Sequence, residues 1–114
     1  MARLKEYSGR ILLEIDNGKI KEYSGRIIYL IDGEYVKEYS GKIIYRIDGE
    51  YIKEYSGRII LSFDGRRVKR YSGSIIYEVD GDKIKEYSGR IVYQIDGFLS
   101  RRELMALLAI LFAS

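Results

Sequence analysis

The chain alternates short runs of apolar, mostly β-branched residues with polar turns that contain glycine. In one unit, Arg26–Ile31 is followed by Asp32-Gly33, and Glu34–Tyr39 is followed by Ser40-Gly41. An Asp-Gly pair between two such runs is a strong hairpin signal, because a type I′ turn requires positive φ at both central residues. Each unit therefore predicts two antiparallel strands of about six residues, here called the A strand (26–31) and the B strand (34–39).

The same unit recurs along most of the chain. Tyr-Ser-Gly returns every sixteen residues, with its tyrosine at Tyr7, Tyr23, Tyr39, Tyr55, Tyr71 and Tyr87. A fixed period of this kind marks a tandem-repeat architecture. Residues 1–97 are thus predicted to form a six-repeat β-meander, with residues 98–114 as a separate C-terminal segment. The fourth repeat, 55–70, departs most from the others, and the fifth has Ser74 where the others have Arg or Lys.

The turns predict the register of the strands. With Asp32-Gly33 as a two-residue turn, Ile31 lies opposite Glu34, and with Ser40-Gly41, Tyr39 lies opposite Lys42. Two equal turns place each residue opposite its own copy in the next repeat, without stagger. A closed barrel requires a cumulative stagger, so the fold class predicted is mainly β: an open antiparallel meander of eleven or twelve strands plus one helix.

The first hairpin has two candidate turns, Asp16-Asn17 and Asn17-Gly18. Asn-Gly is the better type I′ pair, and its use would set Ile15 opposite Ile20 while keeping the same faces. The sequence leaves this choice open.

Strand alternation divides each repeat between two faces. One face is apolar with acidic margins and is predicted to be packed: Ile27, Tyr29, Ile31, Val36, Glu34 and Glu38. The other face is rich in tyrosine and basic residues and is predicted to be wetter: Tyr35, Tyr39, Ile28, Arg26 and Lys37.

The C-terminal segment has the pattern of a short helix. Ser100 and Glu103 form a capping box, and Leu104–Ala113 is rich in Ala and Leu. This helix of about three turns is apolar nearly all round, which indicates burial on more than one side. About ten apolar residues are too few to span a bilayer, so no membrane span is predicted.

A single-layer sheet would expose its apolar face, and soluble monomers rarely expose large apolar patches. The helix can cover only part of that face, so a second copy of the chain is predicted to cover the rest in a homodimer. The predicted interface is Ile27, Tyr29, Ile31, Val36, Ile43, Tyr45, Ile47, Ile52, Leu104, Leu107, Leu108 and Leu111. The edge strands Arg3–Tyr7 and Arg90–Ile95 are complementary, so chains could also join head to tail as a ring or filament.

The amino-acid composition limits the kinds of catalytic and metal site that the chain can carry. The chain has no Cys, which excludes disulfides and thiolate metal sites, and no His, the commonest general base and metal ligand. Each turn supplies one Asp, which is typical of turns rather than of calcium sites. We therefore expect no enzyme activity, no metal and no cofactor. The start Met1–Lys5 lacks the apolar run of a secretory signal, and a cytoplasmic location is expected.

The basic residues suggest binding of anions as an alternative to a purely structural role. Arg66, Arg67, Lys69 and Arg70 form a cluster that could bind anions, and the Tyr/Lys/Arg face could stack and hold single-stranded nucleic acid. The net charge is only +3, which permits an acidic partner without requiring one. The same residues can be explained without a ligand. They could form cross-strand pairs on a solvated face, or reflect random divergence among the repeats.

Two resemblances follow from Tyr39-Ser40-Gly41 and Asp48-Gly49. The hairpin unit loosely resembles membrane occupation and recognition nexus repeats, which implies a ribbon-like scaffold or interaction surface, although the period here is shorter. The chain is more similar to uncharacterised bacterial tandem-repeat proteins built on a Tyr-Ser-Gly-Arg-Ile unit, a resemblance that implies no activity. Near-identical repeats are compatible with recent duplication or with design. We expect a self-associating structural or protein-interaction module, with anion or nucleic-acid binding as the alternative.

Overall fold

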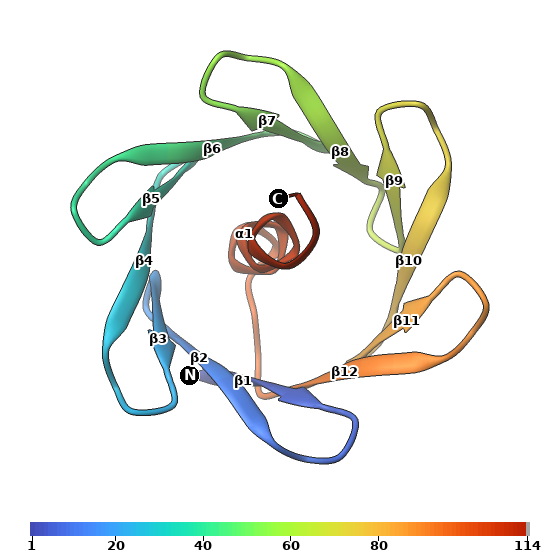
Figure 1. Cartoon of the computed structure of the whole chain (residues 1–114), viewed down its shortest axis with the longest axis horizontal. Coiled ribbons are helices and arrows are strands. Elements are labelled where there is room, and N and C mark those ends of the chain that lie inside the picture. Colours follow the sequence, from blue (N-terminus) through green and yellow to red (C-terminus); the bar gives the residue numbers. More distant parts are fainter. Residues whose placement is uncertain (114) are drawn as a thin grey trace.

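Twelve antiparallel strands close into a barrel around one helix in the computed structural model, which describes residues 1–113 (Figure 1). The A strands are β2 (Ile11–Asp16), β4 (Ile27–Asp32), β6 (Ile43–Asp48), β8 (Ile59–Phe63), β10 (Ile75–Asp80) and β12 (Ile91–Asp96). The B strands are β1 (Ala2–Glu6), β3 (Lys19–Glu22), β5 (Tyr35–Glu38), β7 (Tyr51–Glu54), β9 (Arg67–Arg70) and β11 (Lys83–Glu86). The helix, α1, spans Arg101–Phe112.

The open meander predicted from the sequence is wrong, because the first and last strands pair with each other. Strand β1 pairs with β12, with Leu4 opposite Ile95. The same pairing joins A and B strands inside a repeat, where Ile31 lies opposite Val36. Strand β1 is therefore the B strand of the sixth repeat. The complementary edges expected to join two chains instead close one chain on itself.

The prediction of zero stagger failed at the turns between A and B strands. Asp32 pairs with Tyr35, so the central turn residues are Gly33 and Glu34 rather than Asp32-Gly33. Gly33 has a φ of 60°, and glycine at the first central position is the signature of a type II′ turn, which suits hairpins as well as type I′. In the first hairpin Asn17-Gly18 forms the turn, with Asn17 at a φ of 52° and Ile15 opposite Ile20.

This register produces the stagger that a barrel needs. Ile31 lies opposite Val36, and Val36 lies opposite Tyr45 in the next repeat. Tyr45 therefore lies level with Ile31, and the two residues are fourteen apart in the chain. In a sheet without stagger, residues at the same level in successive repeats would be sixteen apart. Six repeats that each shift by two residues accumulate a shear of about twelve, equal to the number of strands, and a shear of this kind is what closes a sheet.

The other turn also differs from the prediction. The Glu38 N–H donates to the Lys42 carbonyl, so Tyr39-Ser40-Gly41 is a three-residue turn. A β-bulge then restores the register, because Val36 pairs with Tyr45 while Lys37 pairs with Ile43, which leaves the residue between them unpaired. Such an extra residue bends its strand and redirects side chains.

The bulge corrects the predicted faces. Ile28 and Ile44, at the bulges, pack against the core. Ile27 and Ile43, placed on the packed face by simple alternation, pair instead with the outward-facing Lys21 and Lys37.

The interior of the barrel is the packed face, as predicted, but it is covered within one chain. Of the predicted interface, Tyr29, Ile31, Val36, Tyr45, Ile47 and Ile52 belong to the barrel core, together with Leu104, Leu107, Leu108 and Leu111 of α1. Fully buried among these are Val36, Ile52, Leu107 and Leu108. The uncovered apolar face that called for a second copy is therefore filled by the chain's own helix (Figure 1).

The helix runs through the barrel from one opening to the other. Ser100 caps its start, where the Glu103 N–H donates to Ser100 Oγ at 3.2 Å and Glu103 Oε1 accepts from the Ser100 N–H at 3.1 Å, which confirms the predicted capping box. At its other end Phe112 stacks on Tyr77, with ring centroids 3.8 Å apart. The predicted segment 98–114 also includes Ser114, which lies outside the described residues. Within residues 1–113 no helix is long and apolar enough to cross a membrane.

Candidate interaction surface

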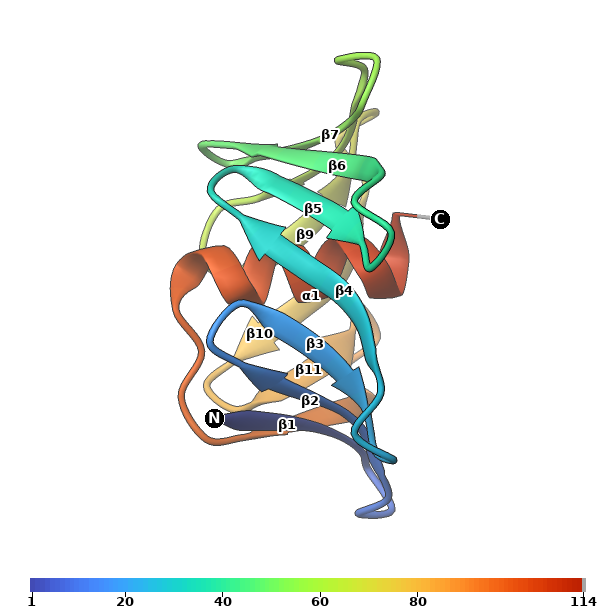
Figure 2. The ribbon, with the colours of Figure 1, turned by 90° about the vertical axis from the view of Figure 1, so that its left-hand side faces the viewer.

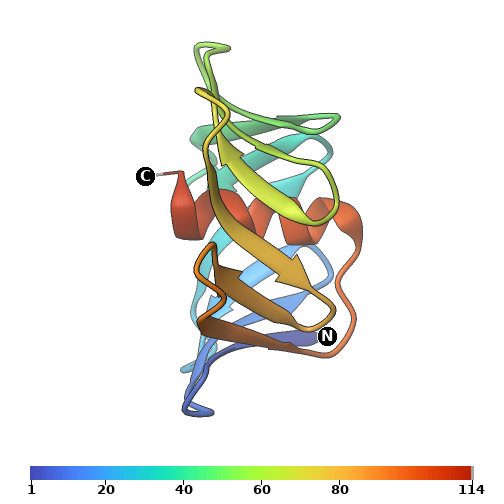
Figure 3. The ribbon, with the colours of Figure 1, turned by 90° about the vertical axis from the view of Figure 1, so that its right-hand side faces the viewer.

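The six Tyr-Ser-Gly hairpin ends flare away from the barrel on the side where α1 ends (Figures 2 and 3). Each end is held by the same two hydrogen bonds. In the first, the Glu6 N–H donates to the Arg10 carbonyl at 2.8 Å and the Gly9 N–H donates to the Glu6 carbonyl at 2.9 Å. Gly9 has a φ of 101°, a backbone conformation that side chains rarely adopt. We call these six hairpin ends the crown.

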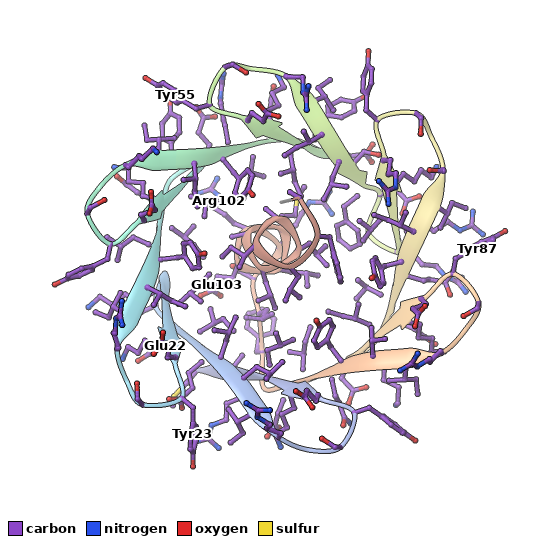
Figure 4. All side chains as sticks on the ribbon, in the orientation of Figure 1. Glu22, Tyr23, Tyr55, Tyr87, Arg102 and Glu103 are labelled. Carbon is purple, nitrogen blue, oxygen red and sulfur yellow. The ribbon has the colours of Figure 1, made fainter. Side chains whose placement is uncertain are left out.

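The turn tyrosines of the crown point away from the barrel axis, as Tyr23, Tyr55 and Tyr87 show in Figure 4. Tyrosine is the first residue of a three-residue turn, so it belongs to neither strand face. The six turn tyrosines are 65–75% exposed. Large aromatic rings this exposed contribute little to the core, and their repetition at one rim singles them out as contact residues.

Grooves lie between neighbouring hairpins of the crown. One groove, of about 500 Å³, is lined by Gly9, Arg10, Ile11 and Leu12 of one hairpin and by Tyr23 of the next. Its floor is aliphatic, one side carries a guanidinium, and the other carries the tyrosine ring.

A second groove has equivalent residues at the seam where the barrel closes. Arg90, Ile91 and Val92 come from the last repeat, and Tyr7 comes from the start of the chain, around a volume of about 350 Å³ that Glu6, Ser8, Leu12 and Tyr93 also line. Arg90, Ile91 and Val92 stand where Arg10, Ile11 and Leu12 stand in the first groove, and Tyr7 stands for Tyr23. The same site is therefore rebuilt across the seam.

Cations and carboxylates of the crown differ in how far they reach outward. Arg10, Arg58 and Arg90 pair with the glutamates four residues earlier, at 3.7, 2.9 and 3.5 Å. The arginine side chains are 74–78% exposed, whereas those of Glu6, Glu54 and Glu86 are 39–42% exposed. Glu22, the equivalent glutamate that Figure 4 labels, lies closer to the axis than its neighbour Tyr23. The outer rim is therefore more positive than the opening it surrounds.

One hairpin breaks this pattern. Arg70 replaces the glutamate and Ser74 replaces the arginine at the end that joins β9 to β10. Its backbone is unchanged, since the Arg70 N–H donates to the Ser74 carbonyl at 3.0 Å and the Gly73 N–H donates to the Arg70 carbonyl at 2.8 Å. By repeat equivalence, Arg70 and Tyr71 face Arg58 across one groove, and Ser74 leaves the next groove without its cation.

The predicted anion cluster at 66–70 does not form one site. Arg66 and Arg67 both approach Glu78, at 3.4 and 3.9 Å, and are partly neutralised by it. Lys69 is on the outer wall beside them, because it pairs with Ser62. Arg70 pairs with Leu61 at the other end of the strand, in the crown. The structure therefore separates Arg70 from the rest of the cluster.

The lysines of the outer wall are paired with the turn aspartates. Lys37, Lys53 and Lys85 lie 2.8, 2.8 and 2.9 Å from Asp32, Asp48 and Asp80. The hydrogen bond from each lysine, and then its charge, lower the pKa of each of these carboxyls. These aspartates neutralise the wall, so the positive character predicted for the Tyr/Lys/Arg face survives mainly at the crown.

Two inward tyrosines of the core have altered acidity. Burial, reinforced by Tyr29 and the Glu54 carboxylate, raises the pKa of Tyr45. Burial also raises the pKa of Tyr93, with smaller contributions from Tyr77 and Glu6. A raised pKa keeps both phenols neutral, which suits a packing role rather than a nucleophile or base.

A pocket of about 350 Å³ lies at the opposite opening, where α1 begins, and is lined by Ile47, Gly49, Arg101, Arg102 and Met105. Arg101 also donates to the Phe63 carbonyl at 3.4 Å and lies over the Phe63 ring. Among residues 1–113 no group of three or more Asp or Glu side chains is arranged to hold a metal ion.

No family model, curated protein or solved structure matches the chain. The resemblances drawn from the repeat unit therefore stay predictions, and the crown is interpreted from its own chemistry. Sequence reasoning treated Tyr-Ser-Gly as turn chemistry and missed the grooves, because each groove combines two consecutive repeats. The available signal was Tyr-Ser-Gly followed by Arg or Lys, which places a large ring and a cation at five of the six turns.

Proposed function

We propose that the chain is a non-catalytic binding module whose working surface is the crown. The observation that carries this proposal is the equivalence of the two grooves, one inside the repeat array and one across its seam. Turn formation alone does not require an exposed tyrosine beside an aliphatic floor. A recurrent site that places an aromatic ring, an apolar floor and a guanidinium together has the composition of a recognition surface.

The rest of the fold suits this role. A closed barrel with a filled interior is a rigid scaffold, and binding residues are commonly carried on turns held by such a scaffold. The crown repeats the same hairpin end around one rim, so a repetitive partner could engage more than one groove at once, which raises the overall affinity without any new contact.

Self-association is not part of this proposal. The residues expected to form a dimer interface fill the interior of a single chain, and the edge strands pair with each other. The absence of catalysis stays a proposal too; it is supported by a crown that offers Tyr, Arg, Ser and Glu in repeated, solvent-exposed positions rather than one tuned pocket.

The test is a binding map by nuclear magnetic resonance with three probes: oligothymidylate, a heparin oligosaccharide and a proline-rich peptide. We expect at least one probe to shift crown amides such as those of Ser24, Gly25 and Arg26. Tyr55→Ala should weaken that binding, whereas Tyr51→Ala, on the outer wall and 45% exposed, should leave it unchanged. Shifts confined to the wall or to the opposite opening for every probe, or no shifts at all, would overturn the proposal.

A further inference from the structure

We propose that the crown binds single-stranded nucleic acid laid around its rim, with the groove between the β7–β8 and β9–β10 hairpins as the strongest contact. This inference rests on the proposed function and names its ligand. Three features of the rim support it: exposed rings, outward cations and a small radius.

The rings supply stacking platforms. Single-strand binding proteins stack successive bases on aromatic side chains, and this contact tolerates any sequence because every base has a π-face. Each groove offers one turn tyrosine above an aliphatic floor, as Tyr23 does above Ile11 and Leu12. A base that is unstacked from the neighbouring bases of the strand can therefore bury one face of its ring at each repeat.

The cations are placed for the phosphates. The side chains of Arg10, Arg58 and Arg90 are far more exposed than those of the glutamates they pair with. Ion pairs this exposed are weak, so a phosphate can compete for the guanidinium. A polyanion that follows the rim therefore meets an arginine at most repeats.

The size of the molecule favours a single strand over a duplex. The disc measures 35 × 35 × 20 Å. Double-stranded DNA has a persistence length of about 500 Å, so bending it around a rim of this size is prohibitive. A single strand is flexible and has unpaired bases free to stack, so it can follow the rim and use several grooves together.

The irregular hairpin predicts where binding is strongest. Arg70 adds a cation opposite Arg58 and removes a carboxylate, so this groove carries two guanidinium groups beside Tyr71. The following groove has Ser74 in place of its cation and keeps Glu86. The crown is therefore polarised around its circumference, and a strand should contact the Arg58–Arg70 groove first.

The test measures the fluorescence anisotropy of labelled oligothymidylate of about 20 nucleotides, long enough to meet several platforms. Two variants convert the irregular hairpin to the consensus of the other repeats, so both should fold. Arg70→Glu should weaken binding and reduce the salt dependence by about one phosphate contact, whereas Ser74→Arg should strengthen binding. Tyr71→Ala should weaken binding about tenfold, with Tyr51→Ala as the matched control.

Competition distinguishes the ligand classes. A duplex of the same length should bind much more weakly than the single strand, and heparin binding should not depend on Tyr71. Equal binding of single strand, duplex and heparin with no loss in Tyr71→Ala would show a general anion site and overturn the inference. No binding of oligothymidylate at low salt would also overturn it. If another probe still shifts the crown amides, the proposed function stands without this ligand.

Discussion

Leu107→Ala tests whether α1 fills the barrel of its own chain. Leu107 is completely buried, and its neighbours come from the barrel wall and the helix. Truncating a fully buried leucine costs about 3–5 kcal/mol, because the transfer free energy is lost and a cavity remains. A closed ring of hydrogen-bonded strands cannot shrink to fill that cavity, so we expect a cost of at least about 3 kcal/mol.

Such a loss is large beside the ~5–15 kcal/mol that stabilises a typical domain. At about 4 °C per kcal/mol for a chain of this size, Tm should fall by about 12 °C. Urea unfolding, followed by circular dichroism at two protein concentrations a factor of ten apart, gives the free energy. Arg102→Ala, an exposed change on the same helix, should stay within about 0.5 kcal/mol of the parent.

Two results would refute this reasoning. A cost below about 1 kcal/mol would mean that Leu107 is not enclosed as the structure places it. An unfolding midpoint that rises with protein concentration would mean that the helix packs between chains, because only an oligomer gains stability with concentration.

Three further predictions follow. Light scattering should give the monomer mass of 13.3 kDa. Twice that mass would support the homodimer predicted from the sequence. Gly33→Ala should cost about 1 kcal/mol through backbone strain alone, because Gly33 has a positive φ and open space surrounds the position; a Tm equal to that of the parent would contradict this. Asp32 and Asp48 have lowered folded pKa values, so their stabilisation is present above the unfolded value of about 3.9 and is lost as pH falls through the folded values. Carboxyl titration by NMR should show Lys37→Gln raising the pKa of Asp32 while that of Asp48 stays low.

Local features of the fold could be predicted from the sequence because short-range chemistry sets them. The hairpin repeat, the strand alternation that buries Val36 and the capping box at Ser100 depend on residues close together in the chain. The correct register of the first hairpin was also among the alternatives, because Asn17-Gly18 carries its own signal.

Closure of the barrel could not be predicted, because a small mistake in the predicted register of one hairpin is repeated in every hairpin and adds up around the sheet. Choosing Gly33-Glu34 instead of Asp32-Gly33 moves one hairpin by only two residues. Repeated six times, that shift turns a ribbon without stagger into a closed sheet. The bulge at Ile28 also has no signature in the sequence, since Ile27 and Ile28 are identical residues and only the three-residue turn decides which one faces inward.

The crown was missed for a related reason. Each groove takes its floor from one repeat and its tyrosine from the next, so it exists only once the strands are placed side by side. Arg70 belongs to a basic run in the sequence, yet alternation along β9 places only Arg67 and Lys69 on the outer wall, while Arg70 ends the strand in the crown.

The number of repeats and the single helix constrain each other. Twelve strands spaced by ~4.8 Å and tilted by about 35° give a circumference of about 70 Å and a wall about 11 Å from the axis. Packed layers lie ~10 Å apart, so one helix with small and medium side chains fills this space, and Ala106 and Ala109 are as completely buried as Leu107 and Leu108. By the same geometry the wall of five repeats would lie about 9 Å from the axis and crowd the helix, whereas seven would leave a gap at about 13 Å. A core of one helix therefore suits six repeats, while the outward turns do not contribute to it, and the change at Arg70 and Ser74 lies in those turns.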